Sequence, residues 1–246
     1  PSMDKAHLHE PHAPLTGWRG WFQAHVREFV YGGMDGAVTT FAVVAGSVGA
    51  GLSTTTVIIL GIANLIADGF SMAVGAFLAQ KTDRESYEKH KQKEYWEVEH
   101  LPEIEREEIR EIYRKKGFTG SALEHAVETI CSDKDRWVDE MMKYELELEP
   151  VTESPWSVGL VTFIAFNTVG AIPLIVYVAP GLLPETVNPF WAACSLTGLA
   201  FLGIGWMKSR INHTPLIRSA SETLFLGAAA ASLAYFAGFY LESLLN

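Results

Sequence analysis

Cysteine, positive charge and strand-like alternation are all scarce in this sequence. The chain has 2 cysteines in 246 residues, Cys131 and Cys194, and neither belongs to a Cys-x-x-Cys pair, so no disulfide framework or thiolate metal site is expected. The formal net charge of −10 argues against nucleic acid as a partner, because phosphate binding needs a basic surface. Without alternating apolar and polar segments, the pattern favours an all-α fold.

Charge is also sparse in the two flanks of the chain. Residues 81–150 hold 20 of the 29 acids and 13 of the 19 bases. The flanks contain five apolar stretches, each long enough to supply the roughly 20 helical residues that cross a bilayer. These stretches are residues 29–49, 55–80, 156–179, 187–207 and 217–241. The sequence therefore predicts an all-α membrane protein with five transmembrane helices and a helical insert between the second and the third.

Basic residues near the ends of the spans indicate the orientation. They are Arg19, Arg27, Lys81, Arg84, Lys208, Arg210 and Arg218. All lie on one side if the N-terminus is cytoplasmic, which also places the insert in the cytosol. The expected parts are an N-terminal arm with an interfacial helix (1–28), transmembrane helices 1 and 2 (29–80), a cytosolic helical metal-binding domain (81–150) and transmembrane helices 3 to 5 (151–246).

The insert is expected to contain several helices. The second span continues outward until Pro102 interrupts it, and Gly117 ends the next helix. The pair Ser121 and Glu124 has the spacing of a capping box at the start of a further helix.

Three acids lie within or near the apolar stretches: Asp35, Asp68 and Glu222. An ionisable side chain inside a span costs at least about 2.5 to 3.5 kcal/mol, so each is a functional candidate. Glu222 has Arg218 four residues before it, and this neighbour at the interface is sufficient to explain it.

The second span carries a polar stripe, since Asn64, Asp68 and Met72 recur every four residues on one helix face. At about 1.5 Å per residue, Asp35 lies about 9 Å and Met72 about 12 Å from the same membrane face, whereas Asp68 lies about 18 Å from it. An Asp and a Met at one depth suit a transition metal, because the thioether is a soft ligand. Ordinary packing of Met72 is the alternative.

One Asp and one Met are too few ligands for a metal ion. A homodimer with its two-fold axis between these helices would double the set. Glycines in the first span allow close helix approach, which suits such an interface. They are Gly32, Gly33, Gly36 and Gly46.

The insert carries carboxylates one turn apart, which can chelate a divalent cation between helices. The candidate ligands are Glu94, Glu97, Glu105, Glu108, Met141, Met142 and Glu145. A solvated acidic surface is the alternative. Glu97 and His100 also form one Glu-x-x-His motif, which raises a membrane-attached di-iron carboxylate oxidase as a rival function. Such a site needs two of these motifs, and the second is missing here.

Four segments together resemble the vacuolar iron transporter family, and the bacterial members in particular. They are REFVYGGMDGAVTTFAVVAG, GIANLIADGFSMAVGAFLA, GFTGSALEHAVETICSDKDRWVDEMMKYELELE and SASETLFLGAAAASLAYFAG. The resemblance implies a homodimeric antiporter and no enzyme, one that exports Fe²⁺ from the cytosol in exchange for protons. Fe²⁺, with Mn²⁺ or Zn²⁺ as alternatives, is then a transported substrate, and no prosthetic group is expected.

The resemblance also assigns roles to residues. Asp35 and Met72 fall on the central ligands of the family's membrane pathway, and the paired glutamates with the Met-Met-x-x-Glu element fall on its metal-collecting domain. Asn64 stands where plant members can have a glutamate, so the proton carrier stays open. Asp68, Asn64 and Glu28 are the candidate proton or pathway residues. The likeness to bacterial members implies an inner membrane as the location.

Overall fold

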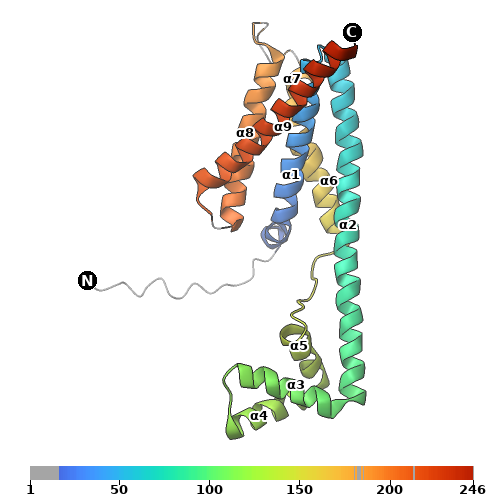
Figure 1. Ribbon diagram of the computed structural model, residues 1–246, viewed down its shortest axis with the longest axis vertical. Coiled ribbons are helices and arrows are strands. Elements are labelled where there is room, and N and C mark those ends of the chain that lie inside the picture. Colours follow the sequence, from blue (N-terminus) through green and yellow to red (C-terminus); the bar gives the residue numbers. More distant parts are fainter. Residues whose placement is uncertain (1–16, 180, 182–183, 185, 213, 246) are drawn as a thin grey trace, which may run out of the picture. The chain divides into compact units, whose positions relative to one another are not determined.

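The computed structural model describes residues 17–179, 181, 184, 186–212 and 214–245, and within these ranges every regular element is helical (Figure 1). The elements are α1 (Trp18–Gly49), α2 (Thr54–His100), α3 (Pro102–Lys115), α4 (Gly120–Cys131), α5 (Lys134–Tyr144), α6 (Pro155–Gly170), the 3₁₀ turn η2 (Ile172–Leu174), α7 (Ile175–Val178), α8 (Pro189–Asn212) and α9 (Leu216–Leu245). The prediction of an all-α chain is confirmed.

Five helical segments are long and apolar enough to cross a membrane, as the sequence predicts. They are Gly20–Gly49, Thr54–His100, Pro155–Val178, Pro189–Asn212 and Leu216–Leu245. The second has 47 residues, or about 70 Å at 1.5 Å per residue, so only part of it is needed to cross a hydrocarbon core of about 30 Å. The third is built from α6, η2 and α7, because Pro173 interrupts regular α-helix there.

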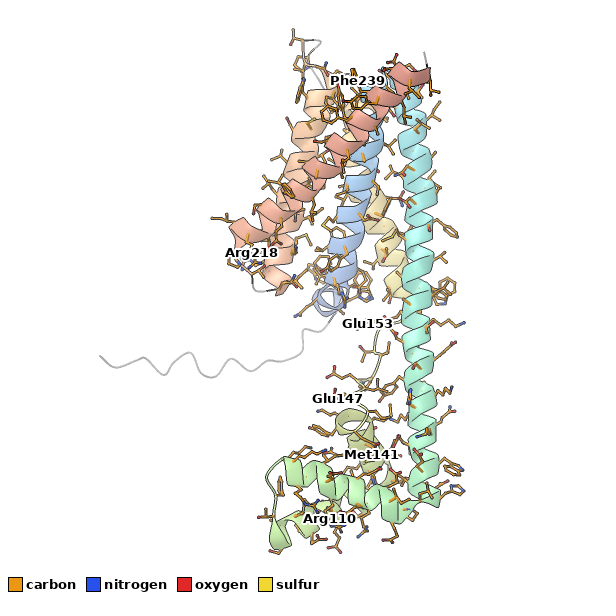
Figure 2. The ribbon with its side chains drawn as sticks, in the orientation of Figure 1. Arg110, Met141, Glu147, Glu153, Arg218 and Phe239 are labelled. Atoms are coloured by element: carbon orange, nitrogen blue, oxygen red, sulfur yellow. The ribbon has the colours of Figure 1, made fainter. Side chains whose placement is uncertain are left out.

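The chain forms two compact units. The membrane unit comprises Pro1–Ala76 and Trp156–Asn246, and the acidic unit comprises Phe77–Pro155. Buried apolar side chains from α1, α2 and α6 to α9 form the core of the membrane unit. The core of the acidic unit contains Met141, labelled in Figure 2, and residues from α2 to α5, namely Tyr87, Val98, Ile109, Leu123, Val127, Trp137, Val138 and Met142.

Glycines allow α1 to approach two other helices of the same chain closely. A Cβ atom at Gly36 would lie 2.3 Å from the carbonyl oxygen of Phe166 on α6. One at Gly238 on α9 would lie 2.1 Å from the carbonyl oxygen of Gly46. Gly32 and Gly33 likewise face α6, at Thr162, Ala165 and Val169. The expectation that these glycines serve a dimer interface is therefore wrong, because their space is filled by α6 and α9 of the same chain.

The helix boundaries of the acidic unit follow the sequence with one exception. Gly117 has a φ of 97° just after α3, as expected of a glycine that ends a helix. The predicted capping box at Ser121 is wrong, because α4 begins at Gly120 and Ser121 lies inside its first turn. Its expected partner Glu124 accepts a hydrogen bond of 3.0 Å from Arg110 instead.

We predict that Gly36→Ala destabilises the membrane unit, because the new methyl group would collide with the backbone of α6. Overpacking of this kind costs about 1 to 3 kcal/mol, which corresponds to a fall of roughly 2 to 10 °C in the melting temperature of the detergent-solubilised protein. Gly203→Ala on α8 is the matched control, since nothing lies within 4 Å of a Cβ atom there. Equal melting temperatures for the two variants would contradict the packing argument.

Candidate metal centre

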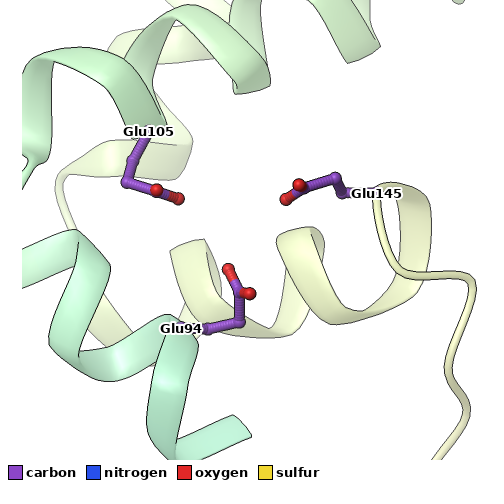
Figure 3. Close-up of side chains that lie close together, drawn as sticks. All are labelled: Glu94, Glu105 and Glu145. Atoms are coloured by element: carbon purple, nitrogen blue, oxygen red, sulfur yellow. The ribbon is translucent and has the colours of Figure 1, made fainter. Parts of the chain in front are cut away.

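Three glutamates from three helices converge in the acidic unit. Glu94 lies on α2, Glu105 on α3 and Glu145 at the C-terminal end of α5. One carboxylate oxygen of each lies within 4.8 Å of those of the other two, and Figure 3 shows the three side chains pointing toward one another. Such a spacing is suited to a divalent cation, which binds carboxylate oxygens at about 2.0 to 2.6 Å.

Pro102 brings the first two of these glutamates together. It cannot continue α2, whose last residue is His100, and it supplies the first residue of α3 at no hydrogen-bond cost. Glu105 then lies in the first turn of α3, where the positive end of the helix dipole favours a carboxylate. Glu94 lies less than two turns before the end of α2. The turn at Pro102 therefore brings the side chains of Glu94 and Glu105 close together.

The Met-Met-x-x-Glu element positions the third glutamate. The carbonyl oxygen of Met141 accepts hydrogen bonds from the N–H groups of Glu145, at 3.0 Å, and of Leu146, at 3.2 Å. These bonds end α5 at this point, and Glu147 follows with a φ of 53°, which turns the chain away. Glu145 is therefore held at the end of the helix, where it reaches the other two carboxylates.

Burial of two carboxylates without an ion pair among the described residues distinguishes this cluster from an ordinary acidic surface. Glu94 is 1% exposed and Glu105 is 4% exposed, whereas Glu145 is exposed. The Oε2 atoms of Glu94 and Glu105 are buried and have no hydrogen-bond partner among the described residues. A buried polar atom normally has such a partner, so these two oxygens are free to accept a proton or a cation.

The ion pairs of the unit involve other acids. They include Lys91 with Asp139, Lys93 with Glu97, Lys116 with Glu140, Lys134 with Glu99, and Arg110 with Glu107 and Glu124. Among the described residues, none of the three converging carboxylates forms an ion pair, although the charge of Lys93 acts on Glu94 and Glu145 from nearby.

Burial and mutual repulsion shift the acidity of the cluster. Burial, followed by the charge of Glu145, raises the pKa of Glu94 from 4.5 to about 7. Burial, followed by the charges of Glu108 and Glu94, raises the pKa of Glu105 from 4.5 to about 8. Burial also raises the pKa of Glu145. Near neutral pH Glu94 is therefore partly protonated and Glu105 mostly protonated, and a metal ion that binds them must displace these protons.

The other predicted ligands of the insert lie beside this cluster in different surroundings. Glu97 accepts a hydrogen bond of 2.8 Å from Lys93, and Glu108 is half-buried, with a pKa that is raised by burial and then by the charge of Glu97. Met141 and Met142 are 0% and 1% exposed and belong to the apolar core of the unit. The structure therefore gives both methionines a packing role.

The membrane unit brings two acids of different helices near each other. Asp35 on α1 and Asp68 on α2 are both half-buried and lie close enough for their charges to interact. The count of residues along the spans predicted, in contrast, that Asp35 and Met72 lie at nearly the same depth in the membrane. Met72 is half-buried and packs against the apolar core of the unit.

Four polar side chains of the membrane unit have buried atoms without a hydrogen-bond partner among the described residues. They are the Oε2 atom of Glu28, the Oγ1 atom of Thr40, the Nδ2 atom of Asn64 and the hydroxyl of Tyr177. Glu28 and Asn64 are among the pathway candidates that the sequence predicts.

The sequence reading overlooked Asn167 on α6. Its Nδ2 atom donates a 2.9 Å hydrogen bond to the carbonyl oxygen of Phe163 and would lie 2.7 Å from a Cβ atom at Gly69, the residue after Asp68. The signal that could have identified Asn167 is its polar side chain within the apolar stretch 156–179. Glu222, in contrast, behaves as expected, because Arg218 and Lys208 each donate to it at 3.1 Å.

Five helices long and apolar enough to span a membrane, together with a carboxylate-rich unit, define the class as integral membrane proteins with an acidic unit suited to cations. A family model described as the VIT family matches residues 26–239. The chain therefore belongs to the VIT family. It is a membrane transport protein and not an enzyme, so the rival di-iron oxidase is not favoured.

Three relatives indicate how closely the chain follows the family. The vacuolar iron transporter of Toxoplasma gondii is 36% identical over 225 residues, which cover 89% of this chain and 74% of the relative. Vacuolar iron transporter 1 of Arabidopsis thaliana is 32% identical over 211 residues, covering 85% and 83%. The vacuolar iron transporter of Plasmodium falciparum is 29% identical over 226 residues, covering 89% and 83%.

We predict that metal binding to the acidic unit strengthens as the pH rises. A carboxyl group is neutral below its pKa and binds a cation poorly, so Glu94 and Glu105 must lose protons to bind. Calorimetric titration of the full-length protein with Mn²⁺ should show tighter binding at about pH 8 than at about pH 6, with protons released. Glu105→Gln should weaken binding more than about ten-fold, whereas Glu103→Gln, an exposed acid on the same turn, should not.

The raised pKa values of Glu94 and Glu105 also predict how the stability of the metal-free protein changes with pH. The folded state binds more protons than the unfolded state between pH 4.5 and about 7 to 8, so these two groups make the fold less stable as the pH rises through that window. Glu105→Gln should therefore raise the metal-free melting temperature at about pH 8. A variant that loses both Mn²⁺ binding and stability would instead indicate a structural role.

Proposed function

We propose that this protein exports divalent transition-metal ions, with Fe²⁺ as the principal substrate, from the cytosol in exchange for protons. Membership of the VIT family and relatives named vacuolar iron transporters support iron as the substrate. The single observation that carries the proposal is the convergence of the carboxylates of Glu94, Glu105 and Glu145, two of which, Glu94 and Glu105, are buried and have an oxygen without a hydrogen-bond partner among the described residues.

In this proposal the three glutamates collect the metal ion. A divalent cation would supply the positive charge that buried carboxylates lack and would lower their mutual repulsion. Carboxylate oxygens accept Fe²⁺ and Mn²⁺ alike, so the cluster by itself gives no preference between the two. The neighbouring Glu97 and Glu108 would provide further acceptors, and Met141 or Met142 would become a ligand only by leaving the apolar core.

The membrane step would use Asp35, with Met72 as a soft ligand. The interaction of Asp35 with Asp68 supports coupling to protons, because a proton taken up by either acid removes the repulsion between them and weakens a bound cation. Both acids stay candidates for the proton carrier. Glu28 and Asn64 would extend the polar pathway along α1 and α2.

A homodimer would complete the membrane site. One chain offers two acids and one thioether, whereas a six-coordinate metal ion needs more ligands. A two-fold axis beside α1 and α2 would supply each ligand twice. Because the glycines of α1 are already packed against α6 and α9, this interface would have to use other side chains.

The basic residues near the span ends support a cytoplasmic N-terminus and a cytosolic acidic unit. A bacterial inner membrane is proposed from the likeness of the second span to bacterial members of the family. The three relatives compared above are eukaryotic.

We predict that a proton gradient drives Fe²⁺ or Mn²⁺ flux in proteoliposomes, and that Asp35→Asn abolishes this flux. The amide cannot take up a proton and is a weaker ligand than a carboxylate. Asp68→Asn should reduce the dependence on the gradient if Asp68 carries the proton. Flux that ignores the pH gradient would indicate a passive channel, and wild-type flux in Asp35→Asn would exclude that residue from the pathway.

We further predict that Met72→Leu lowers the flux of Fe²⁺ while leaving the fold intact. The substitution conserves volume and costs less than about 1.5 kcal/mol in a packed core, so it removes the sulfur with little else. Met207→Leu on α8 is the matched control for the loss of one methionine. Equal Fe²⁺ fluxes in the two variants would indicate that Met72 contributes to packing and is not a metal ligand.

A further inference from the structure

A pocket with basic and polar side chains in its lining lies in the membrane unit, between α1 and the end of α8. It has a volume of about 270 Å³. Its lining residues are Arg27, Val30, Tyr31, Lys208, Ile211 and Asn212. At about 30 Å³ for each water molecule, this volume accommodates roughly nine waters, which is enough for a phosphate with a small organic group.

Positive charge prevails around this pocket. Lys208 and Arg218 both donate to the one carboxylate of Glu222, so a single negative charge is shared by two positive ones. Figure 2 labels Arg218 at the start of α9. Arg27 is exposed and has no ion pair among the described residues. The half-buried Glu28 is the one acid next to it in the chain.

Aromatic side chains mark the depth of the pocket. Trp21 on α1 is 52% exposed, and Trp206 on α8 is 51% exposed. They precede Arg27 by six residues and Lys208 by two. Exposed tryptophans at the ends of membrane helices lie at the level of the lipid headgroups. The pocket is thus expected where phosphate groups of the bilayer are concentrated.

We propose that this pocket binds the phosphate of an anionic phospholipid headgroup. Arg27 and Lys208 supply the charge, and the amide of Asn212 and the hydroxyl of Tyr31 are hydrogen-bond donors on the same wall. Basic pockets between membrane helices are suited to such headgroups. The lipid would tie α1 to α8 at this face. None of the lining residues is a proposed metal ligand, and the proposal does not depend on the proposed transport function.

The test compares the stabilisation of the full-length, detergent-solubilised protein by phosphatidylglycerol and by phosphatidylcholine. Phosphatidylglycerol should raise the melting temperature more. Arg27→Gln with Lys208→Gln should weaken its apparent affinity by about five-fold for each charge removed. Lys81→Gln with Arg84→Gln removes two charges outside the pocket and should leave the affinity unchanged. Glu222→Gln should tighten binding, a gain that a poorly folded variant cannot produce.

Two outcomes would overturn the proposal. Equal effects of the two lipids on the wild-type protein would show that no anionic headgroup is recognised. Equal losses in the pocket and control variants would show that only general surface charge matters. A parallel titration with inorganic phosphate distinguishes the sources, because stabilisation by phosphate alone would assign the pocket to a soluble phosphate and not to a lipid.

Discussion

Two carboxylates that are buried without an ion pair among the described residues are the constraint on which the acidic unit depends. Glu94 and Glu105 are almost inaccessible, yet one oxygen of each lacks a hydrogen-bond partner within the described chain. Leaving a charge buried and unpaired is among the most destabilising arrangements in a protein. The raised pKa values avoid this arrangement because these groups then hold protons. A cation bound as we propose would avoid it too, and protons and metal ions would then compete for the same oxygens.

The membrane unit solves a different problem, the placement of an acid among apolar helices. Gly36 directly follows Asp35 and lies against the backbone of α6, while Gly46 and Gly238 join α1 to α9. Rotation of α1 about its axis would bring a side chain into one of these contacts. Close packing through glycine thus fixes the direction in which Asp35 points, and this direction sets its distance to Asp68. The position of the acid is a property of the helix packing on both sides of it.

Much of this arrangement could be predicted from the sequence, because its causes are local. The length of the apolar stretches predicts five spans, and Pro102 predicts the break between α2 and α3. Carboxylate spacing nominated all three members of the cluster, but it could not separate Glu94 from Glu97, which lies one turn away. Only the packing of α3 and α5 buries one and leaves the other beside Lys93.

A similar limit explains the difference at the glycines of α1, whereas the pairing of Asp35 with Met72 stays a prediction. Glycines along one helix indicate a close approach, but not which helix approaches. The count of residues from the membrane face gave a depth for Asp35 and for Met72, but it assumed helices perpendicular to the bilayer. Tilt and rotation of the helices come from tertiary contacts, and these brought Asp35 near Asp68. The electrostatic interaction between Asp35 and Asp68 therefore could not be predicted by counting residues along the spans.

The pKa values of the cluster also bear on whether the acidic unit stores a metal ion or passes it on. A storage site holds its ion most tightly when its ligands are fully ionised before the metal arrives. Here the pKa values of about 7 and about 8 mean that binding near neutral pH must first expel protons, which lowers the affinity. Glu145 is exposed at the edge of the cluster, so water and incoming ions can reach it. We infer that a moderate, proton-sensitive affinity suits a unit that releases its ion as readily as it binds it.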